Sequence, residues 1–240
     1  MSWQARLDDS DVVRREYATD AGLSGRIAAY RFAVGPDPRE RAFEAIAETE
    51  PRRVVEVGCG QGVMAERIQR ELGCEVVAID QSQHMVHLTR ARGVKAAVGD
   101  VQELPFSEGE FDVALAAWML HHVSDVDRAL SELARVLAPA GRLVAVTNAG
   151  DHLHELAELL GSETRQSSFS AENGEPQLLR HFARVEGREA YGWIAFPSRL
   201  EAQEYVDATV ILSGGGRKLP EFEGPLRVRR APVVFVAERA

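Results

Sequence analysis

Hydrophobic and polar positions follow two different periods in the middle of the chain. Apolar, largely β-branched runs at 53–57 and 75–79, and a shorter one at 95–98, predict strands, because a strand buried on both faces of a sheet is apolar at nearly every position. After each of the first two strands the apolar residues recur every three or four positions, which predicts helices. Gly73 suits a helix C-cap and Ser82 a helix N-cap. This alternation predicts an α/β fold with a parallel sheet covered by helices on both faces.

The first predicted strand runs directly into a glycine-rich loop, with Gly58, Gly60 and Gly62 at alternate positions. Without a Cβ, these residues let the backbone turn sharply and approach a ligand closely. A dinucleotide-binding loop needs a glycine where the chain has Val63, and the Gly-Lys-Ser/Thr of a phosphate-binding loop is absent from the sequence. The glycines alone are also compatible with a tight turn that binds nothing.

A carboxylate stands at the end of each of these strands: Glu56, Asp80 and Asp100. Ligands of parallel sheets bind at the carboxyl ends of the strands, where an acid can accept hydrogen bonds from both hydroxyls of a ribose. Each acid could instead cap the helix that follows. Three in succession favour a nucleoside site.

Further segments extend this pattern until it resembles the class I S-adenosylmethionine-dependent methyltransferases, particularly the ubiquinone/menaquinone-type and natural-product subgroup. The resemblance covers about residues 50 to 150 and rests on positions 54–62, 77–80, 99–101, 104–106, 111–113, 120–123 and 134–143. It implies a Rossmann-like, mostly parallel seven-stranded sheet with helices on both faces and an N-terminal helical lid. One departure is Ala140, where the family usually has glycine, and we expect it only to stiffen a turn.

The resemblance also implies a cofactor, S-adenosyl-L-methionine, with S-adenosyl-L-homocysteine as product and no metal. In such families the backbone of Gly58, Cys59 and Gly60 receives the methionine portion, while Glu56 anchors the loop and faces the ammonium group. The resemblance further implies that Asp80 binds the ribose hydroxyls and that Gln81 and Met85 flank ribose and adenine. Asp100 would bind the adenine amino group and the Val101 amide an adenine ring nitrogen. Ala116 and Ala117 would pass near the methionine portion.

Three histidines are candidates for the chemistry. Methyl transfer is an in-line displacement that depends on holding donor and acceptor together, and an acceptor that must lose a proton needs a base with a pKa near the working pH. His121 is the first candidate and His122 the second, since both follow the fourth strand. His152, after the fifth strand, is a third, with Asn148 as an orienting residue. Each histidine could instead be a packing residue.

We predict a single methyltransferase domain over residues 1–240, because this length with 45% hydrophobic residues can bury one large core. Residues 1–50 form an N-terminal helical cap, 51–150 the cofactor-binding core, and 151–240 the substrate pocket and closing strands. Tyr17 and Tyr30 lie on the apolar stripe of the cap and are expected to line the substrate pocket. The last part should contain helices at 171–182 and 198–212 and strands at 190–196 and 232–236.

The net charge of the chain argues against one class of partner, nucleic acid. With 28 Lys and Arg against 37 Asp and Glu, the net charge of −9 disfavours nonspecific attraction to nucleic acid. The basic cluster at 227–230 reads as a solvated approach to the last strand. No apolar run is long enough to span a membrane and the N-terminus lacks a secretory signal, so we expect a cytoplasmic location and no membrane partner.

The resemblance, together with the acidic net charge, favours an enzyme (EC 2.1.1.-) that methylates a small molecule, in natural-product or quinone-like metabolism. Three alternatives stay open: a methyltransferase acting on RNA or protein through Arg227, Arg229 and Arg230, a non-catalytic protein that binds the cofactor, and a nicotinamide-dependent oxidoreductase, against which Val63 argues. The sequence does not distinguish N-, O- and C-methylation, and it leaves the oligomeric state open.

Overall fold

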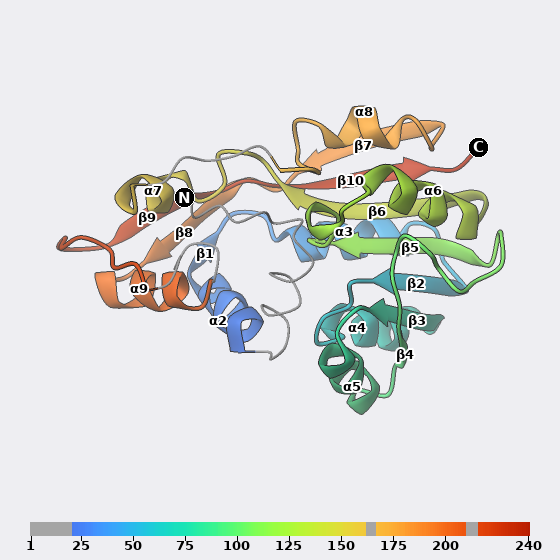
Figure 1. The fold of residues 1–240 in the computed structure, drawn as a ribbon, viewed down its shortest axis with the longest axis horizontal. Helices are drawn as coiled ribbons and strands as arrows, with labels where there is room; N and C mark the ends of the chain where they lie inside the picture. Colours follow the sequence, from blue (N-terminus) through green and yellow to red (C-terminus); the bar gives the residue numbers. More distant parts are fainter. Residues whose placement is uncertain (1–20, 162–166, 210–215) are drawn as a thin grey trace.

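Two sheets lie side by side in the computed structural model, which describes residues 21–161, 167–209 and 216–240 (Figure 1). The larger sheet has seven strands in the order β4-β3-β2-β5-β6-β10-β7, and the smaller has three in the order β1-β8-β9. Tyr17 lies outside the described residues.

The larger sheet is the predicted one. Its strands are β2 (Arg53–Val57), β3 (Glu75–Asp80), β4 (Lys95–Val98), β5 (Phe111–Ala117), β6 (Leu137–Asn148), β7 (Arg184–Glu189) and β10 (Pro232–Glu238). The strands β4, β3, β2, β5 and β6 pair in parallel, whereas β10 pairs antiparallel with both β6 and β7. The Rossmann-like, mostly parallel seven-stranded fold is therefore confirmed.

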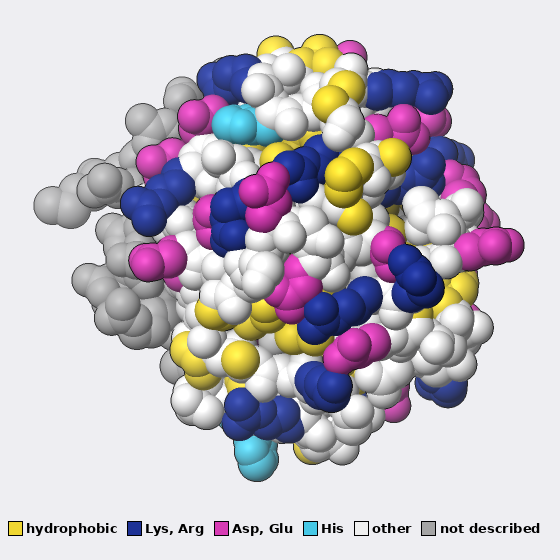
Figure 2. Space-filling model, turned by 90° about the vertical axis from the view of Figure 1, so that its right-hand side faces the viewer, with side chains coloured by type: hydrophobic (Ala, Val, Ile, Leu, Met, Phe, Trp, Pro, Cys, Tyr) yellow, Lys and Arg dark blue, Asp and Glu magenta, His cyan; other side chains and the backbone are white. Residues whose placement is uncertain are grey.

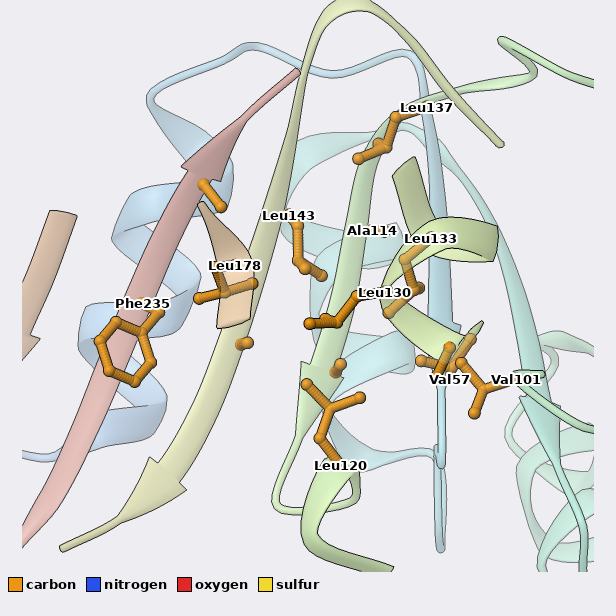
Figure 3. Packing of buried hydrophobic residues seen from close by; sticks show 14 of the residues in the cluster. Val57, Val101, Ala114, Leu120, Leu130, Leu133, Leu137, Leu143, Leu178 and Phe235 are labelled. Carbon is orange, nitrogen blue, oxygen red and sulfur yellow. The ribbon is translucent and has the colours of Figure 1, made fainter. Parts of the chain in front are cut away.

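Helices cover both faces of this sheet. They are α3 (Pro38–Ala47), α4 (Val63–Leu72), α5 (Gln83–Ala91), α6 (Val126–Val136) and α8 (Gly174–Leu178). Alternate residues of each strand face opposite layers, so Val55 and Val57 pack in the core beneath α6, while Val54 packs in the core beneath α3 and α4. Figure 3 shows Leu130 and Leu133 of α6 directed at the strands.

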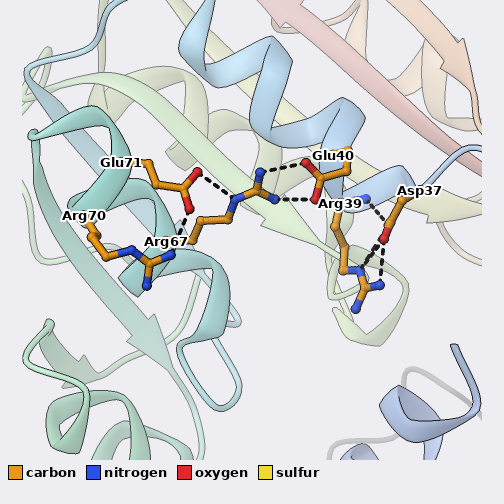
Figure 4. A network of polar contacts seen from close by, with 6 residues as sticks. All are labelled: Asp37, Arg39, Glu40, Arg67, Arg70 and Glu71. Atoms are coloured by element: carbon orange, nitrogen blue, oxygen red, sulfur yellow. Dashed lines mark hydrogen bonds and ion pairs between the residues drawn. The ribbon is translucent and has the colours of Figure 1, made fainter. Parts of the chain in front are cut away.

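Local signals place the helix ends as predicted. The Ser82 hydroxyl accepts a hydrogen bond from the Met85 amide and caps α5, and Gly73 ends α4 with φ 66°. An ion-pair network joins α3 to α4 (Figure 4): the Arg67 guanidinium contacts Glu40 at 2.6 Å and Glu71 at 3.2 Å. Because the two carboxylates are exposed to solvent, which screens their charges, these pairs contribute little to stability.

The smaller sheet was not anticipated. Its central strand β8 (Gly192–Phe196) pairs antiparallel with β1 (Ala33–Val34) and with β9 (Leu226–Arg230). The helices α2 (Ala21–Ala29), α7 (His154–Leu159) and α9 (Arg199–Asp207) supply side chains to the core cluster around this sheet. A single residue, Ala231, separates β9 from β10, so one stretch of chain crosses from the smaller sheet into the larger.

The C-terminal elements differ from the prediction in extent. The strand expected at 190–196 is β8, but it belongs to the smaller sheet, and β10 confirms the strand expected at 232–236. The helix expected at 171–182 covers only Gly174–Leu178. The Leu179 amide still bonds the Glu175 carbonyl at 2.9 Å, but the Arg180 amide bonds Gln177, only three residues back, so the α-helical pattern ends there. The helix expected at 198–212 ends at Asp207 as α9, and residues 210–212 lie outside the described part.

Ala140 corrects one expectation. Its φ of 59° lies in the left-handed region, which costs an L-residue roughly 1 kcal/mol relative to glycine. The substitution therefore strains the turn instead of merely stiffening it. Within the described ranges, no helix is both long and apolar enough to cross a bilayer.

Candidate cofactor and acceptor sites

The glycine loop joins β2 to α4 with three left-handed glycines, whose φ values are 67° at Gly58, 53° at Gly60 and 73° at Gly62. Packing adds a second requirement. A Cβ at Gly58 would lie 2.6 Å from the Cβ of Met119, and one at Gly62 would lie 2.6 Å from the hydroxyl oxygen of Thr89. Side chains at these positions would thus both strain the backbone and push neighbouring elements apart.

Asp80, at the end of β3, holds this loop in place. One carboxylate oxygen accepts the Gly60 amide at 2.9 Å, and the other accepts the Ser82 amide at 2.8 Å. Burial raises the pKa of Asp80, while these two amides act in the opposite direction. Each carboxylate oxygen has a further lone pair, so the group can still accept hydrogen bonds from a pair of hydroxyls.

Glu56 is a buried carboxyl group, with 3% of its surface exposed. Its side chain interacts with the backbone N–H of Ala65 in the first turn of α4, while its Oε2 atom has no hydrogen-bond partner within the described part of the chain. Burial, helped by the charge of Asp80, raises the pKa of Glu56 to about 8. An unpartnered buried acid of this kind is suited to a cationic group, and it fits the predicted ammonium.

The other predicted adenosine contacts occupy the ends of β3 and β4. Asp100 accepts the Gln102 amide at 2.9 Å, so it also caps a turn, as Asp80 does through Ser82. Gln81 is exposed at the start of the β3–α5 connection, whereas Val101 and Met85 are buried. Capping and ligand binding are thus compatible for both aspartates. The roles of these residues toward adenosine stay predictions.

The segment after β5 holds a residue that the sequence reading missed. Trp118 has φ 52°, rare for a bulky side chain, and its indole N–H donates to the Asn148 side-chain oxygen at 3.2 Å. Asn148 therefore orients Trp118 across the ends of β5 and β6. Ala116 is buried and Ala117 half-buried. A tryptophan two residues before the Leu-His-His segment was the available signal.

His121 and His122 form the short helix η2 (Leu120–His122), with ring centroids 4.1 Å apart. Burial, followed by the charges of His122, Arg26 and His152, keeps the pKa of His121 well below its usual value. The imidazole is therefore neutral near pH 7 and can accept a proton.

His152 has a different environment. Its Nδ1 atom accepts the Ala231 amide at 3.1 Å, which leaves the proton of the neutral ring on Nε2. Burial and the charge of Arg230 lower the pKa of His152 to about 3. A neutral His152 is thus placed to donate a hydrogen bond, which makes it a weaker candidate for a base than His121.

The N-terminal cap reaches the glycine loop through α2. A methyl carbon of Leu23 lies 3.2 Å from where a Cβ of Gly60 would stand, and the Gln61 side-chain amide bonds the Ser24 hydroxyl at 2.7 Å. Tyr30 follows in the short helix η1 (Tyr30–Phe32), where burial raises its phenol pKa. The described part of the cap therefore lies beside the predicted cofactor loop.

The basic cluster at 227–230 is not a solvated approach to a strand, because it forms most of the strand β9, in which Arg230 is buried. Arg227 lies over the ring of Trp193 at 4.8 Å, and Arg229 pairs with Asp151 at 2.7 Å. Arg230 is buried, with 1% of its surface exposed. Consecutive residues of a strand point to opposite faces, so Arg230 faces away from Arg227 and Arg229, which share the other face of β9.

Comparison with known proteins shows which proteins this chain resembles. Residues 55–145 match the methyltransferase domain family. Over 115 residues the chain is 37% identical to demethylmenaquinone methyltransferase of Thermus thermophilus, a match covering 45% of this chain and 52% of that protein. The chain thus spans about half the length of this relative.

Two solved structures share the fold. A methyltransferase of Thermotoga maritima, described as a possible histamine N-methyltransferase, has a TM-score of 0.61 at 20% identity over 95% of this chain and 100% of that one. The [4+2]-cyclase SpnF has a TM-score of 0.64 at 22% identity over 100% and 99%. The match over residues 55–145 agrees with the resemblance seen in the sequence, and the two solved structures share the fold of this chain.

Proposed function

We propose that this protein transfers a methyl group from S-adenosylmethionine to a small-molecule acceptor. One observation carries the proposal. Glu56, the glycine loop and Asp80 lie together at one edge of the sheet, and all of them fall within the methyltransferase-domain match over 55–145. When bound, the cofactor supplies a methyl group on a sulfonium, which leaves as a neutral thioether. The protein binds both molecules, orients them and excludes water.

The residues divide this work between two neighbouring places. The loop at Gly58–Gly60 and the carboxylates of Glu56 and Asp80 would hold the donor, with Asp100, Val101, Gln81 and Met85 toward adenine. His121 would take the proton of an acceptor that must lose one, because it is the histidine kept neutral without a backbone bond fixing its proton. Asn148 and Tyr30 would line the acceptor side.

A small acceptor is supported over a polymer by the arrangement of the arginines. A polymer groove needs cations on one accessible surface, and Arg227, Arg229 and Arg230 do not share one. Figure 2 shows one end of the molecule, where basic and acidic side chains are interspersed. A role in quinone-like or natural-product metabolism and a cytoplasmic location stay predictions.

A second candidate, a protein that binds the cofactor without transferring its methyl group, is favoured by one observation. The fold neighbour with a TM-score of 0.64 is described as a cyclase. Two measurements separate the candidates. Calorimetry with S-adenosylmethionine and S-adenosylhomocysteine should show saturable binding under both, and its absence contradicts both. Incubation with methyl-labelled donor and a metabolite extract should yield a labelled small molecule only for the transferase.

A further inference from the structure

Arg230 is one of two buried charged side chains in the described part of the protein, the other being Glu56. It ends β9, opposite Gly192 of β8. One nitrogen of its guanidinium, Nη2, donates to the carbonyl of Pro36, two residues beyond the end of β1, at 2.6 Å. The ring of Tyr30 lies 5.7 Å away.

Most of the donors of Arg230 have no acceptor. Nε and Nη1, which together carry three N–H bonds, are buried and unpartnered among the described residues. Asp37 is close enough for Arg230 to help lower its pKa, but both oxygens of Asp37 are bound by Arg39, at 3.0 Å and 2.7 Å (Figure 4). The carboxylate near Arg230 is thus already engaged.

An unpartnered buried guanidinium is costly. Arginine stays protonated at any ordinary pH, and a buried charge without a partner is more expensive than an apolar side chain of similar volume. The single hydrogen bond to Pro36 ties the segment after β1 to β9, yet a neutral side chain could fill the volume that Arg230 occupies. The retained charge therefore indicates an anion that enters from outside the fold.

The location of Arg230 connects it to the candidate acceptor site. The next residue, Ala231, donates its amide to His152 at 3.1 Å and accepts the Ala149 amide at 2.8 Å. This hydrogen bond places His152, which follows β6, beside the residue next to Arg230. His121 in η2 follows β5, the strand that pairs in parallel with β6. With Nδ1 occupied, the neutral ring of His152 has its Nε2–H available as a donor.

We propose that Arg230 binds an oxyanion group, a carboxylate or a phosphate, on the methyl acceptor, with His152 Nε2–H as a second donor. The inference rests on the proposed function only in naming the bound molecule as the acceptor. The acceptor is then a small acid, held by its charged group while its nucleophilic atom lies toward His121.

The test uses the whole protein in the presence of S-adenosylhomocysteine. Benzoate, inorganic phosphate, uncharged benzamide and chloride are titrated at matched ionic strength, and binding is followed by thermal unfolding and calorimetry. The variants are Arg230→Met, Arg230→Lys and, as a matched control on the neighbouring residue, Arg229→Met. Arg229 already has Asp151 as its partner, so its loss should leave probe binding unchanged.

We expect benzoate or phosphate, but not benzamide or chloride, to stabilise the wild-type protein saturably. Loss of the charged donors should weaken that binding by about tenfold or more in Arg230→Met, with partial retention in Arg230→Lys. A response to benzoate identifies a carboxylate, and one to phosphate alone identifies a phosphate. The unliganded Arg230→Met protein should unfold at the same temperature as wild type or higher.

Three results overturn the proposal: no saturable response to either anion, equal responses in wild type and Arg230→Met, or a clear loss of stability in unliganded Arg230→Met that marks Arg230 as purely structural. None of these readouts involves methyl transfer. Failure of the proposed function would instead appear as missing cofactor binding or missing labelled product.

Discussion

The two halves of the site differ in charge and in how the chain builds them. At the ends of β2, β3 and β4 the candidate side chains are acids. Backbone amides two residues further along bond Asp80 and Asp100, and Asp80 also accepts the amide of Gly60 in the glycine loop. Beyond β5 and β6 the groups are neutral histidines and a buried arginine, brought together from η2, the β6–α7 connection and β9. An acidic half suits a cationic methyl donor, and a basic half suits an acceptor with the opposite charge.

The largest effect should come from the acceptor half. Replacing His121 with alanine should lower turnover by roughly 10²- to 10⁴-fold if it removes an acceptor proton, while calorimetry shows unchanged cofactor affinity. Because the pKa of His121 is held well below its usual value, wild-type turnover should stay flat as pH falls from about 8 to 6.5. His122→Ala is the matched control. An equal loss of turnover in His121→Ala and His122→Ala would contradict the assignment of His121 as the base.

Asp80→Asn should weaken cofactor binding and leave the acceptor half unchanged. The amide keeps one acceptor oxygen for the loop but loses the charge that hydroxyls would contact, so affinity for S-adenosylhomocysteine should fall by about 1–3 kcal/mol. Binding of benzoate or phosphate should be unaffected. Since Asp80 also anchors Gly60, thermal unfolding must accompany the calorimetry. Unchanged cofactor affinity would contradict the ribose assignment.

Glu56 makes a smaller, pH-dependent prediction. Its pKa is about 8 in the folded protein against 4.5 as the ordinary value, so the folded state binds the extra proton between these limits. The stability that Glu56 contributes is therefore fully present below about pH 4.5 and is lost as pH rises through about 8. Glu56→Gln should flatten this dependence in denaturant unfolding measured from pH 5 to 8.

Cofactor binding should reveal the same group. If the ammonium faces Glu56, S-adenosylmethionine binding at pH 7 should release close to one proton, measured by calorimetry in buffers of different ionisation enthalpy. The Glu56→Gln protein should release none. Proton release that is equal in both proteins would place the ammonium elsewhere.

Ala140→Gly should act on neither half. Relief of the left-handed strain at φ 59° should stabilise the folded state by about 1 kcal/mol. The greater conformational entropy of glycine in the unfolded chain opposes part of this gain. Cofactor affinity and anion binding should both stay at wild-type values. A change in either would show that the β6 turn communicates with the site.

The cofactor half could be predicted from sequence because its parts are local. Strand periodicity, the glycines and the terminal acids occur within short windows, and parallel strands bring their ends to one edge. The acceptor half could not be predicted because residues that are in contact there are far apart in the sequence. Ala231 bonds His152 across 79 positions, and Arg230 bonds Pro36 across 194. Arg230 lies on the same face of β9 as the buried Val228, but no strand was predicted at these residues, so this alternation did not mark Arg230 as buried.

The smaller sheet escaped prediction for a similar reason. Its strand β1 has two residues, too few for a period to be recognised, and its pairing with β8 joins opposite ends of the chain. Trp118 was missed because nothing in the surrounding sequence marks a left-handed backbone at a bulky residue.

The single residue between β9 and β10 has a mechanical consequence. Ala231 is bonded on both sides, to His152 and to Ala149, so the two sheets form one rigid wall without a hinge at that point. Any movement of the smaller sheet relative to the larger one at this point has to break one of these two hydrogen bonds, so the position of Arg230 is tied to that of His152.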